Sequence, residues 1–384
     1  DLHSFPTRRS SDLGNYMDMV DGLYNAHIAD AVRKGLISEF TVNTAVERIL
    51  RQKYRLGLFD NPYAFLDNAR EQQTVRSAEL MALAREAATK SMVLLKNEGG
   101  VLPLSKQVRR IAVIGPLADN QAEVLGSWKA RGEDADVVTV VKGLRNKLGT
   151  NAHVEYVRGC DFLDTKNNEF AKARQAAANA DVVIAVVGEK ALMSGESRSR
   201  AFLSLPGLQQ QLIDTLKSTG KPLVTVLMNG RPLTLARVAE QSDALLEAWF
   251  PGTQCGNAVA DVLFGDVNPS GKLTVSFPYA EGQIPNYYNY RRSGRPGDME
   301  QTSTVRHIDL KNRNLYPFGF GLSYTTFEYG PIECASHFDA NGRLKVSVDV
   351  KNTGNRDGEE IVQLYVADKV ASMVRNYQDR KSVV

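Results

Sequence analysis

The sequence predicts an α/β protein whose main domain is a mainly parallel α/β sandwich, preceded by a helical segment and followed by a small β domain. Between residues 108 and 265, five short apolar runs alternate with helical stretches. Runs that are apolar almost throughout are typical of strands covered by helices on both faces of a parallel sheet. After residue 343 the pattern becomes a strict apolar-polar alternation, which is typical of an antiparallel sheet with one exposed face.

The segment before the sandwich predicts helices and no strand. Apolar residues recur at helical spacing within residues 41–54, and the Gly and Asn-Pro of GLFDNPY end that helix. A second helix is expected over residues 74–90, which are rich in Ala, Leu and Met. Helices without a sheet of their own indicate the trailing end of a larger domain.

The sandwich itself is expected to contain five buried strands joined by covering helices. The strands are predicted at residues 111–115, 154–159, 181–188, 222–230 and 244–252, and helices at 167–180, from Pro206 to 216, and at 256–265. In such sheets the ligand-binding loops follow the carboxyl ends of the strands. A site is therefore expected at that edge.

The last part of the chain predicts a linker and then a β domain. Residues 279–330 are rich in Tyr, Gly, Pro and Arg, which indicates a linker with little regular structure. Alternating Leu and Val over residues 344–350 predicts one strand, and residues 359–368 predict a second after a Gly-Asn-Arg-Asp-Gly turn. We expect these two strands to form an antiparallel hairpin.

The composition excludes several classes of function. The 384 residues contain 47 Lys and Arg and 44 Asp and Glu, giving a formal net charge of +3. No dense basic tract is interleaved with aromatic residues, so neither nucleic acid nor an anionic membrane is an expected partner. No run of 18 apolar residues occurs, so no transmembrane helix is expected. The expected partner is a small neutral molecule.

Metal and nucleotide sites are not expected either. Cys160, Cys255 and Cys334 match no metal or redox spacing, and we interpret them as small buried apolar residues. The five histidines are also scattered. The segment IAVIGPLAD (111–119) begins like a dinucleotide-binding turn but has only one of its three glycines.

The informative loop is GEKALMSGESRSRAFLSLP, residues 188–206, which follows a buried strand. It carries two carboxylates, Glu189 and Glu196, with Arg198 and Arg200 close by. A glutamate on a loop at the carboxyl end of a strand is well placed to act as a general acid. The same composition is typical of a solvated charge cluster, so the residues alone leave both interpretations open.

Seven stretches, taken together and in order, resemble the C-terminal half of the family 3 glycoside hydrolases, the β-glucosidase-like enzymes. They are YMDMVDG (16–22), KYRLGLFDNPY (53–63), SMVLLKNEGGVLPL (91–104), IAVIGPLAD (111–119), VLMNGRPL (226–233), AWFPGTQCGNAVADVLFGDVNPSGKLTVSFP (248–278) and LYPFGFGLSYTTF (315–327). The resemblance implies the following domains: 14–67 the C-terminal remnant of a (β/α)8-like barrel, 85–278 the α/β sandwich, 279–330 a linker, and 331–378 a truncated fibronectin type III-like domain.

The resemblance also implies a retaining exo-acting β-glycosidase, most often a β-glucosidase, that uses two carboxylates and no cofactor. Glu196 matches the acid/base position, and Glu189 is the alternative with a more structural setting. The nucleophile of the family is a barrel Asp usually followed by Trp, but neither Trp128 nor Trp249 follows an Asp. The chain is therefore expected to be inactive alone, because without the nucleophile the covalent step cannot occur.

Four further residues are expected to contact or orient the carbohydrate substrate. Trp128 either stacks on a sugar at an aglycone subsite or is a partly buried core residue. Arg198 and Arg200 are expected to orient the loop rather than transfer protons, and Asp18 is expected to border the glycone site. The resemblance implies a periplasmic or secreted protein. It leaves open which sugar and linkage are cleaved and what the oligomeric state is.

Residues 1–13 (DLHSFPTRRSSDL) and 379–384 (DRKSVV) resemble translations of the two strands of a common sequencing adapter. They are set apart from fold reasoning, so the expected natural segment is 14–378. Two other functions are kept as alternatives. A non-catalytic sugar-binding or structural α/β module predicts a genuine start near residue 14, whereas a nucleotide-binding α/β protein predicts a shift in melting temperature with NAD or ATP.

Overall fold

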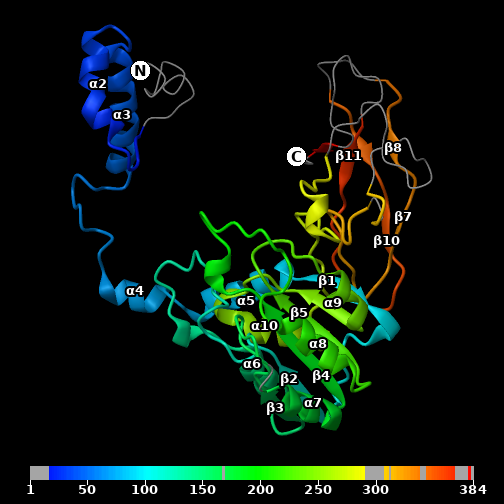
Figure 1. Cartoon of the computed structure of the whole chain (residues 1–384). Coiled ribbons are helices and arrows are strands. Elements are labelled where there is room, and N and C mark those ends of the chain that lie inside the picture. The colour runs from blue at the N-terminus through cyan, green and yellow to red at the C-terminus, as the bar shows by residue number, and fades with distance from the viewer. Residues whose placement is uncertain are drawn as a thin grey trace. The chain divides into compact units, whose positions relative to one another are not determined.

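The computed structural model divides into two compact units at residues 77 and 78, each of which is described by itself (Figure 1). It describes residues 17–166, 169–289, 307–310, 313–337, 343–367 and, for the backbone alone, 379–381. The adapter-like residues 1–13 and the last three residues lie outside this set. Of the second adapter-like segment, Asp379–Lys381 form a strand, β12.

The first unit is helical over its described residues, as predicted. It contains α2 (Leu23–Arg33), α3 (Glu39–Arg55) and α4 (Asn68–Thr74). Ser38 caps α3 by accepting a 3.1 Å hydrogen bond from the Thr41 amide, and Asp67 caps α4 through the Arg70 amide. No residue of α3 is buried. The assignment of this unit to the end of a barrel stays a prediction.

The second unit is built on a six-stranded sheet with the order β1-β6-β5-β4-β2-β3. The strands are β1 (Val93–Asn97), β2 (Arg110–Ile114), β3 (His153–Val157), β4 (Val182–Gly188), β5 (Leu223–Met228) and β6 (Ala244–Glu247). The five predicted strands are confirmed and pair in parallel, while β1 pairs antiparallel with β6. Strand β1 was missed because it follows a helix almost directly and pairs with a partner about 150 residues away.

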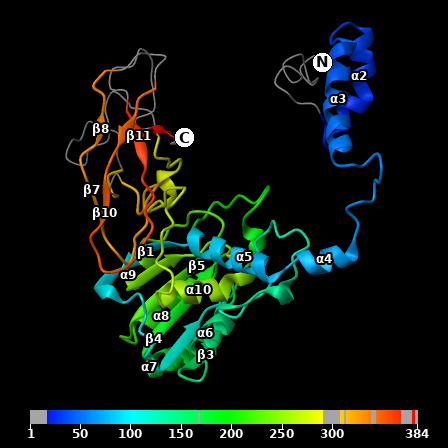
Figure 2. The same ribbon diagram turned by 180° about the vertical axis from the view of Figure 1, so that it is seen from behind.

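Helices cover both faces of this sheet (Figures 1 and 2). They are α5 (Ala78–Ser91), α6 (Val140–Leu148), α7 (Phe170–Asn179), α8 (Gln209–Lys217), α9 (Ala236–Gln241) and α10 (Cys255–Leu263). Residues of α5, α6 and α10 form one apolar core with alternate strand residues. Residues of α7, α8 and α9 form the other core with the remaining strand residues. This explains why the strands are apolar throughout.

Two predicted helices differ from the structure in an instructive way. The helix expected to begin at Pro206 begins at Gln209, because Gly207 adopts a left-handed conformation with φ of +62° that interrupts it. The helix predicted at 256–265 to cover the sheet is α10 (Cys255–Leu263), and nearly all of its residues are buried. It is enclosed because α5 and α6 both pack against it.

The C-terminal part contains short strands that pair in twos. They are β7 (Phe327–Tyr329), β8 (Glu333–Cys334), β9 (Val346–Ser347), β10 (Val350–Asn352), β11 (Leu364–Val366) and β12 (Asp379–Lys381). The predicted hairpin is wrong, since β10 pairs with β7, β9 with β8 and β11 with β12. Alternation defines the faces of a strand but not its partner. The fibronectin type III-like assignment stays a prediction.

This part is attached to the sandwich by polar contacts. Lys272 forms an ion pair of 3.2 Å with Glu360, and the Asn268 side chain donates a 2.9 Å hydrogen bond to the Asp357 carbonyl. Short 3₁₀ turns complete the chain at Glu98–Gly100, Asp134–Asp136, Ala191–Met193, Gly252–Gln254 and Glu281–Gln283. Among the described residues, every helix is too short or too polar to cross a bilayer.

Candidate active site

The candidate site lies on loops that follow the carboxyl ends of β2, β4, β5 and β6. Strand β4 ends at Gly188, where φ is +150° and an added Cβ would lie 1.8 Å from the Met228 carbonyl oxygen of β5. Only glycine lets the two strands approach so closely at this point. The chain then enters the loop that carries both predicted carboxylates.

Glu196 is exposed at the tip of this loop. Its two neighbours have unusual backbone conformations, since φ is +123° at Gly195 and +57° at Ser197. A serine in the left-handed region is uncommon and is strained. The Arg198 amide closes the turn by donating a 3.3 Å hydrogen bond to the Gly195 carbonyl. The turn therefore presents the Glu196 side chain to solvent.

Trp128 lies beside this tip, on the loop after β2. A Cβ added to Gly195 would lie 2.6 Å from the Ser127 hydroxyl oxygen and 3.7 Å from Trp128 Nε1. The Trp128 side chain is 74% exposed, so the alternative of a partly buried core residue is wrong. An exposed indole beside an exposed carboxyl group places a flat apolar surface next to a titratable side chain.

Glu189, the second carboxylate of the loop, has a different environment. Its side chain is fully buried and forms ion pairs with Arg200 Nη1 at 2.6 Å and Arg231 Nε at 3.1 Å. It also accepts a 3.3 Å hydrogen bond from the Gly230 amide. These contacts match the structural setting expected for Glu189. Arg200 contacts Glu189 and donates a 3.0 Å hydrogen bond to the Ser204 carbonyl, and its expected role in orienting the loop stays a prediction.

Arg198 contributes to the loop through its backbone. Its side chain is exposed, while its carbonyl oxygen accepts a 2.6 Å hydrogen bond from Arg231 Nη2. The same Nη2 donates to the Met193 carbonyl. Arg231 was not predicted. Its signal in the sequence is an arginine shortly after the end of the apolar run that forms β5.

Glu247, at the end of β6, was also missed. It is fully buried, and the loss of hydration raises its pKa to about 8. The nearby Glu189 carboxylate also raises this pKa, whereas two hydrogen bonds lower it. Those hydrogen bonds come from the Trp249 amide at 2.9 Å and Asn229 Nδ2 at 3.1 Å. The sequence indicated this residue by a glutamate inside the apolar run ALLEAWF. Charged residues are rarely buried in such a strand unless they have a partner.

Asp18 belongs to the first unit. There its carboxylate accepts a 3.1 Å hydrogen bond from the Tyr24 amide near the start of α2. Its place at the glycone site stays a prediction. The other predicted residues, Glu196, Trp128, Arg198 and Arg200, all lie on neighbouring loops of the second unit.

The described side chains include no group of three or more His, Cys, Asp or Glu that is arranged to hold a metal ion. Cys160 and Cys255 are buried, as predicted, and burial raises the pKa of each thiol to about 12. Cys334 is exposed, so the prediction that it is buried is wrong. It lies on the short strand β8, where both residues are exposed.

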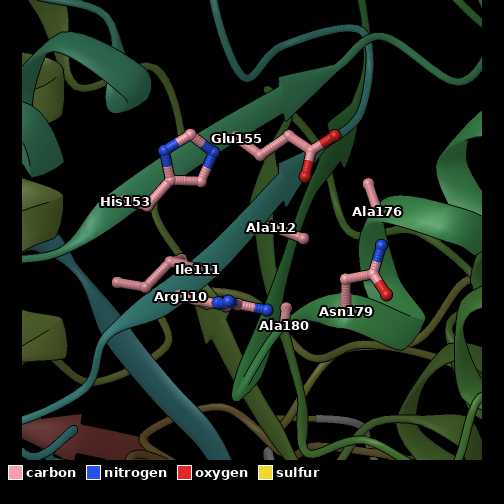
Figure 3. A pocket seen from close by; sticks show the side chains of 8 residues that line it. All are labelled: Arg110, Ile111, Ala112, His153, Glu155, Ala176, Asn179 and Ala180. Atoms are coloured by element: carbon pink, nitrogen blue, oxygen red, sulfur yellow. The ribbon is translucent and has the colours of Figure 1, made fainter.

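Two cavities frame the sheet at opposite edges. One of about 690 Å³ lies at the carboxyl ends of β5 and β6, and its lining includes Arg231, Trp249 and Lys272. Another, of about 350 Å³, lies at the amino ends of β2 and β3. Figure 3 shows its lining, which includes the polar side chains of Arg110, His153, Glu155 and Asn179. Arg231 lines the first of these cavities and also donates a hydrogen bond to the Glu196 loop.

Comparison with known proteins places most of the second unit in a known family. Residues 92–324 match the model of the glycosyl hydrolase family 3 C-terminal domain. The chain is 43% identical over 391 residues to the periplasmic beta-glucosidase of Salmonella typhimurium, and the match covers 95% of this chain and 51% of that protein. It is 40% identical over 372 residues to a beta-xylosidase of Formosa agariphila, covering 94% and 50% of the two chains.

A crystal structure of a beta-glucosidase from Listeria innocua in complex with glucose is also similar. It has a TM-score of 0.87 and 38% identity, and the match covers 97% of this chain and 51% of that one. The same protein has been solved with isofagomine and, as a mutant, with laminaribiose. The chain thus spans about half the length of these relatives.

Proposed function

The chain belongs to glycosyl hydrolase family 3, and from this premise we propose that it is the part of a retaining, exo-acting β-glycosidase that supplies the acid/base, Glu196. One observation carries the proposal. Of the two carboxylates on the loop after β4, Glu189 is buried and paired with two arginines, while Glu196 is exposed beside an exposed tryptophan. A residue that must protonate a substrate needs this access.

In the proposed reaction Glu196 acts twice. It first donates its proton to the glycosidic oxygen as the bond to the leaving group breaks. It then takes a proton from the water that hydrolyses the glycosyl-enzyme intermediate. Because Arg200 and Arg231 pair with Glu189, neither guanidinium neutralises the Glu196 carboxylate. Trp128 is proposed to stack on the sugar that leaves.

The second carboxylate of the reaction is proposed to come from outside this chain. A retaining glycosidase places its nucleophile about 5 to 5.5 Å from the acid/base. The resemblance implies a nucleophile Asp that is usually followed by Trp, and neither Trp128 nor Trp249 follows an Asp. We therefore propose that the chain alone does not hydrolyse glycosides, because without the family nucleophile the covalent intermediate does not form.

The proposed substrate is a terminal β-linked sugar, most often glucose. Relatives named as beta-glucosidases and the glucose and laminaribiose complexes of the Listeria protein support glucose. A relative named as a beta-xylosidase supports xylose as the alternative sugar. We also propose a periplasmic or secreted location, supported by the name of the Salmonella relative.

The test joins this chain to a donor of the other half. In the chimaera, residues 14–378 replace the matching half of the Salmonella periplasmic beta-glucosidase, 43% identical to this chain. We expect it to hydrolyse an aryl β-glucoside and Glu196→Gln to lower kcat by about 100-fold or more, as expected for loss of a general acid. The matched control is Glu240→Gln, because Glu240 is an exposed glutamate on α9.

Three outcomes separate the candidates. Loss of activity in Glu196→Gln but not in Glu240→Gln supports the proposal. An active chimaera that tolerates Glu196→Gln refutes the assignment of the acid/base. An inactive chimaera whose fluorescence is quenched by glucose, with the quenching lost in Trp128→Ala, favours the alternative of a non-catalytic sugar-binding module, for which the exposed Trp128 is the supporting observation.

A further inference from the structure

Arg231 connects the Glu196 turn to the sheet. Its Nη2 donates to the Met193 carbonyl on one side of the turn and to the Arg198 carbonyl, 2.6 Å away, on the other. Its Nε lies 3.1 Å from the Glu189 carboxylate. One side chain therefore contacts both ends of the segment 194–197 and a buried anchor at once.

The turn needs such a connection because it has little support of its own. Its backbone hydrogen bonds are long, 3.4 Å from the Ser194 amide to Ala191 and 3.3 Å from the Arg198 amide to Gly195. Ser197 is in the left-handed region, which costs on the order of 1 kcal/mol unless surrounding contacts compensate. Within the described residues the Glu196 carboxylate has no hydrogen bond or ion pair. Its position therefore depends on the backbone.

The anchor of this connection is buried and paired. Glu189 directly follows β4, is fully buried, and also binds Arg200, whose second nitrogen donates to the Ser204 carbonyl at 3.0 Å. Arg231 follows β5, the neighbour of β4 in the sheet. Its side chain is 17% exposed, so its hydrogen bonds are partly shielded from water.

We propose that Arg231 is a positioning residue that fixes the Glu196 turn to Glu189 and so defines where the acid/base carboxylate is presented. The inference rests on the proposed function of Glu196. It needs the guanidinium specifically, because a planar group with several N–H donors reaches two carbonyls and one carboxylate together, which a lysine ammonium does not reproduce. The substrate is not touched by Arg231 in this role.

The first test measures the turn itself in the full chain. Arg198 and Arg200 are trypsin sites next to the turn, so the rate of cleavage after them, followed by mass spectrometry, reports how often the turn opens. We expect Arg231→Met to raise this rate about tenfold, as expected for lost charge-assisted hydrogen bonds. Arg231→Lys should show a smaller rise. The control Arg237→Met removes a surface ion pair with Asp214 and should change nothing.

Two results of this test would overturn the inference. One is an unchanged cleavage rate at the turn in Arg231→Met. The other is a rise that is equal at the turn and after Lys96, inside strand β1, because that describes global unfolding rather than a mobile turn. Neither result depends on which residue is the acid/base, so the test separates this inference from the proposed function.

The second test links the turn to catalysis in the chimaera. Arg231→Met should lower kcat/KM, which reports the step that needs the acid, for an aryl glucoside with a poor leaving group. A 2,4-dinitrophenyl leaving group needs no protonation, so its release should be much less affected. A merely structural role would lower both rates equally, and that result would contradict positioning. If Glu196→Gln leaves the chimaera active, the proposed function fails while the cleavage test still decides the role of Arg231.

Discussion

The buried carboxyl of Glu247 makes the stability of the second unit depend on pH, and Glu247→Gln removes this dependence. Burial raises the pKa of this group from 4.5 to about 8 in the folded protein. The folded state therefore binds a proton that the unfolded state releases, and stability falls as pH rises between these values. The free energy of unfolding falls by about 1.4 kcal/mol per pH unit. Between pH 4.5 and pH 8 the total loss is about 5 kcal/mol.

Urea unfolding at pH 5, 6, 7 and 8 measures this directly. Both tryptophans, Trp128 and Trp249, belong to the second unit, so their fluorescence follows its unfolding. Between pH 5 and 8 we expect the free energy of unfolding of the wild type, relative to that of Glu247→Gln, to fall by about 4 kcal/mol. Glu240→Gln should follow the wild type. Parallel curves for wild type and Glu247→Gln would refute the argument.

Two further predictions concern packing and the substrate. Gly143→Ala should lower the free energy of unfolding by roughly 2 to 3 kcal/mol in urea, because the new Cβ would lie 2.1 Å from the Gly256 carbonyl where α6 crosses α10. Gly282→Ala, which meets no atom within 4 Å, should be nearly neutral. Trp128→Ala should leave the urea midpoint unchanged, since the side chain is exposed, but raise KM for aryl glucosides several-fold in the chimaera.

The central sheet was predictable because its strands are buried on both faces and read as unbroken apolar runs. The edge strand β1 was not predicted, because its pairing with β6 is a long-range contact that leaves no local pattern. The hairpin prediction failed for the same reason. Val350 pairs with Tyr329 and not with the segment that follows the turn. Local periodicity predicts elements, whereas pairing depends on which strand edges meet in space.

The candidate site was predictable only in part. Glu196 was reached through a family resemblance, since loop composition did not separate it from Glu189. What distinguishes the two is burial and pairing, and both involve Arg231, a residue that lies far beyond Glu189 in the sequence. The raised pKa of Glu247 depends on its complete burial. Its apolar run indicated this burial but not which groups face the carboxyl.

The most direct test of the central claim is the leaving-group dependence of the Glu196→Gln chimaera. The measurement compares kcat/KM for phenyl and 2,4-dinitrophenyl β-glucosides in wild type and variant. If Glu196 is the general acid, the variant loses activity strongly on the phenyl glucoside and much less on the dinitrophenyl glucoside, whose departure needs no proton. Equal losses on both substrates would contradict the assignment of Glu196 as the acid/base.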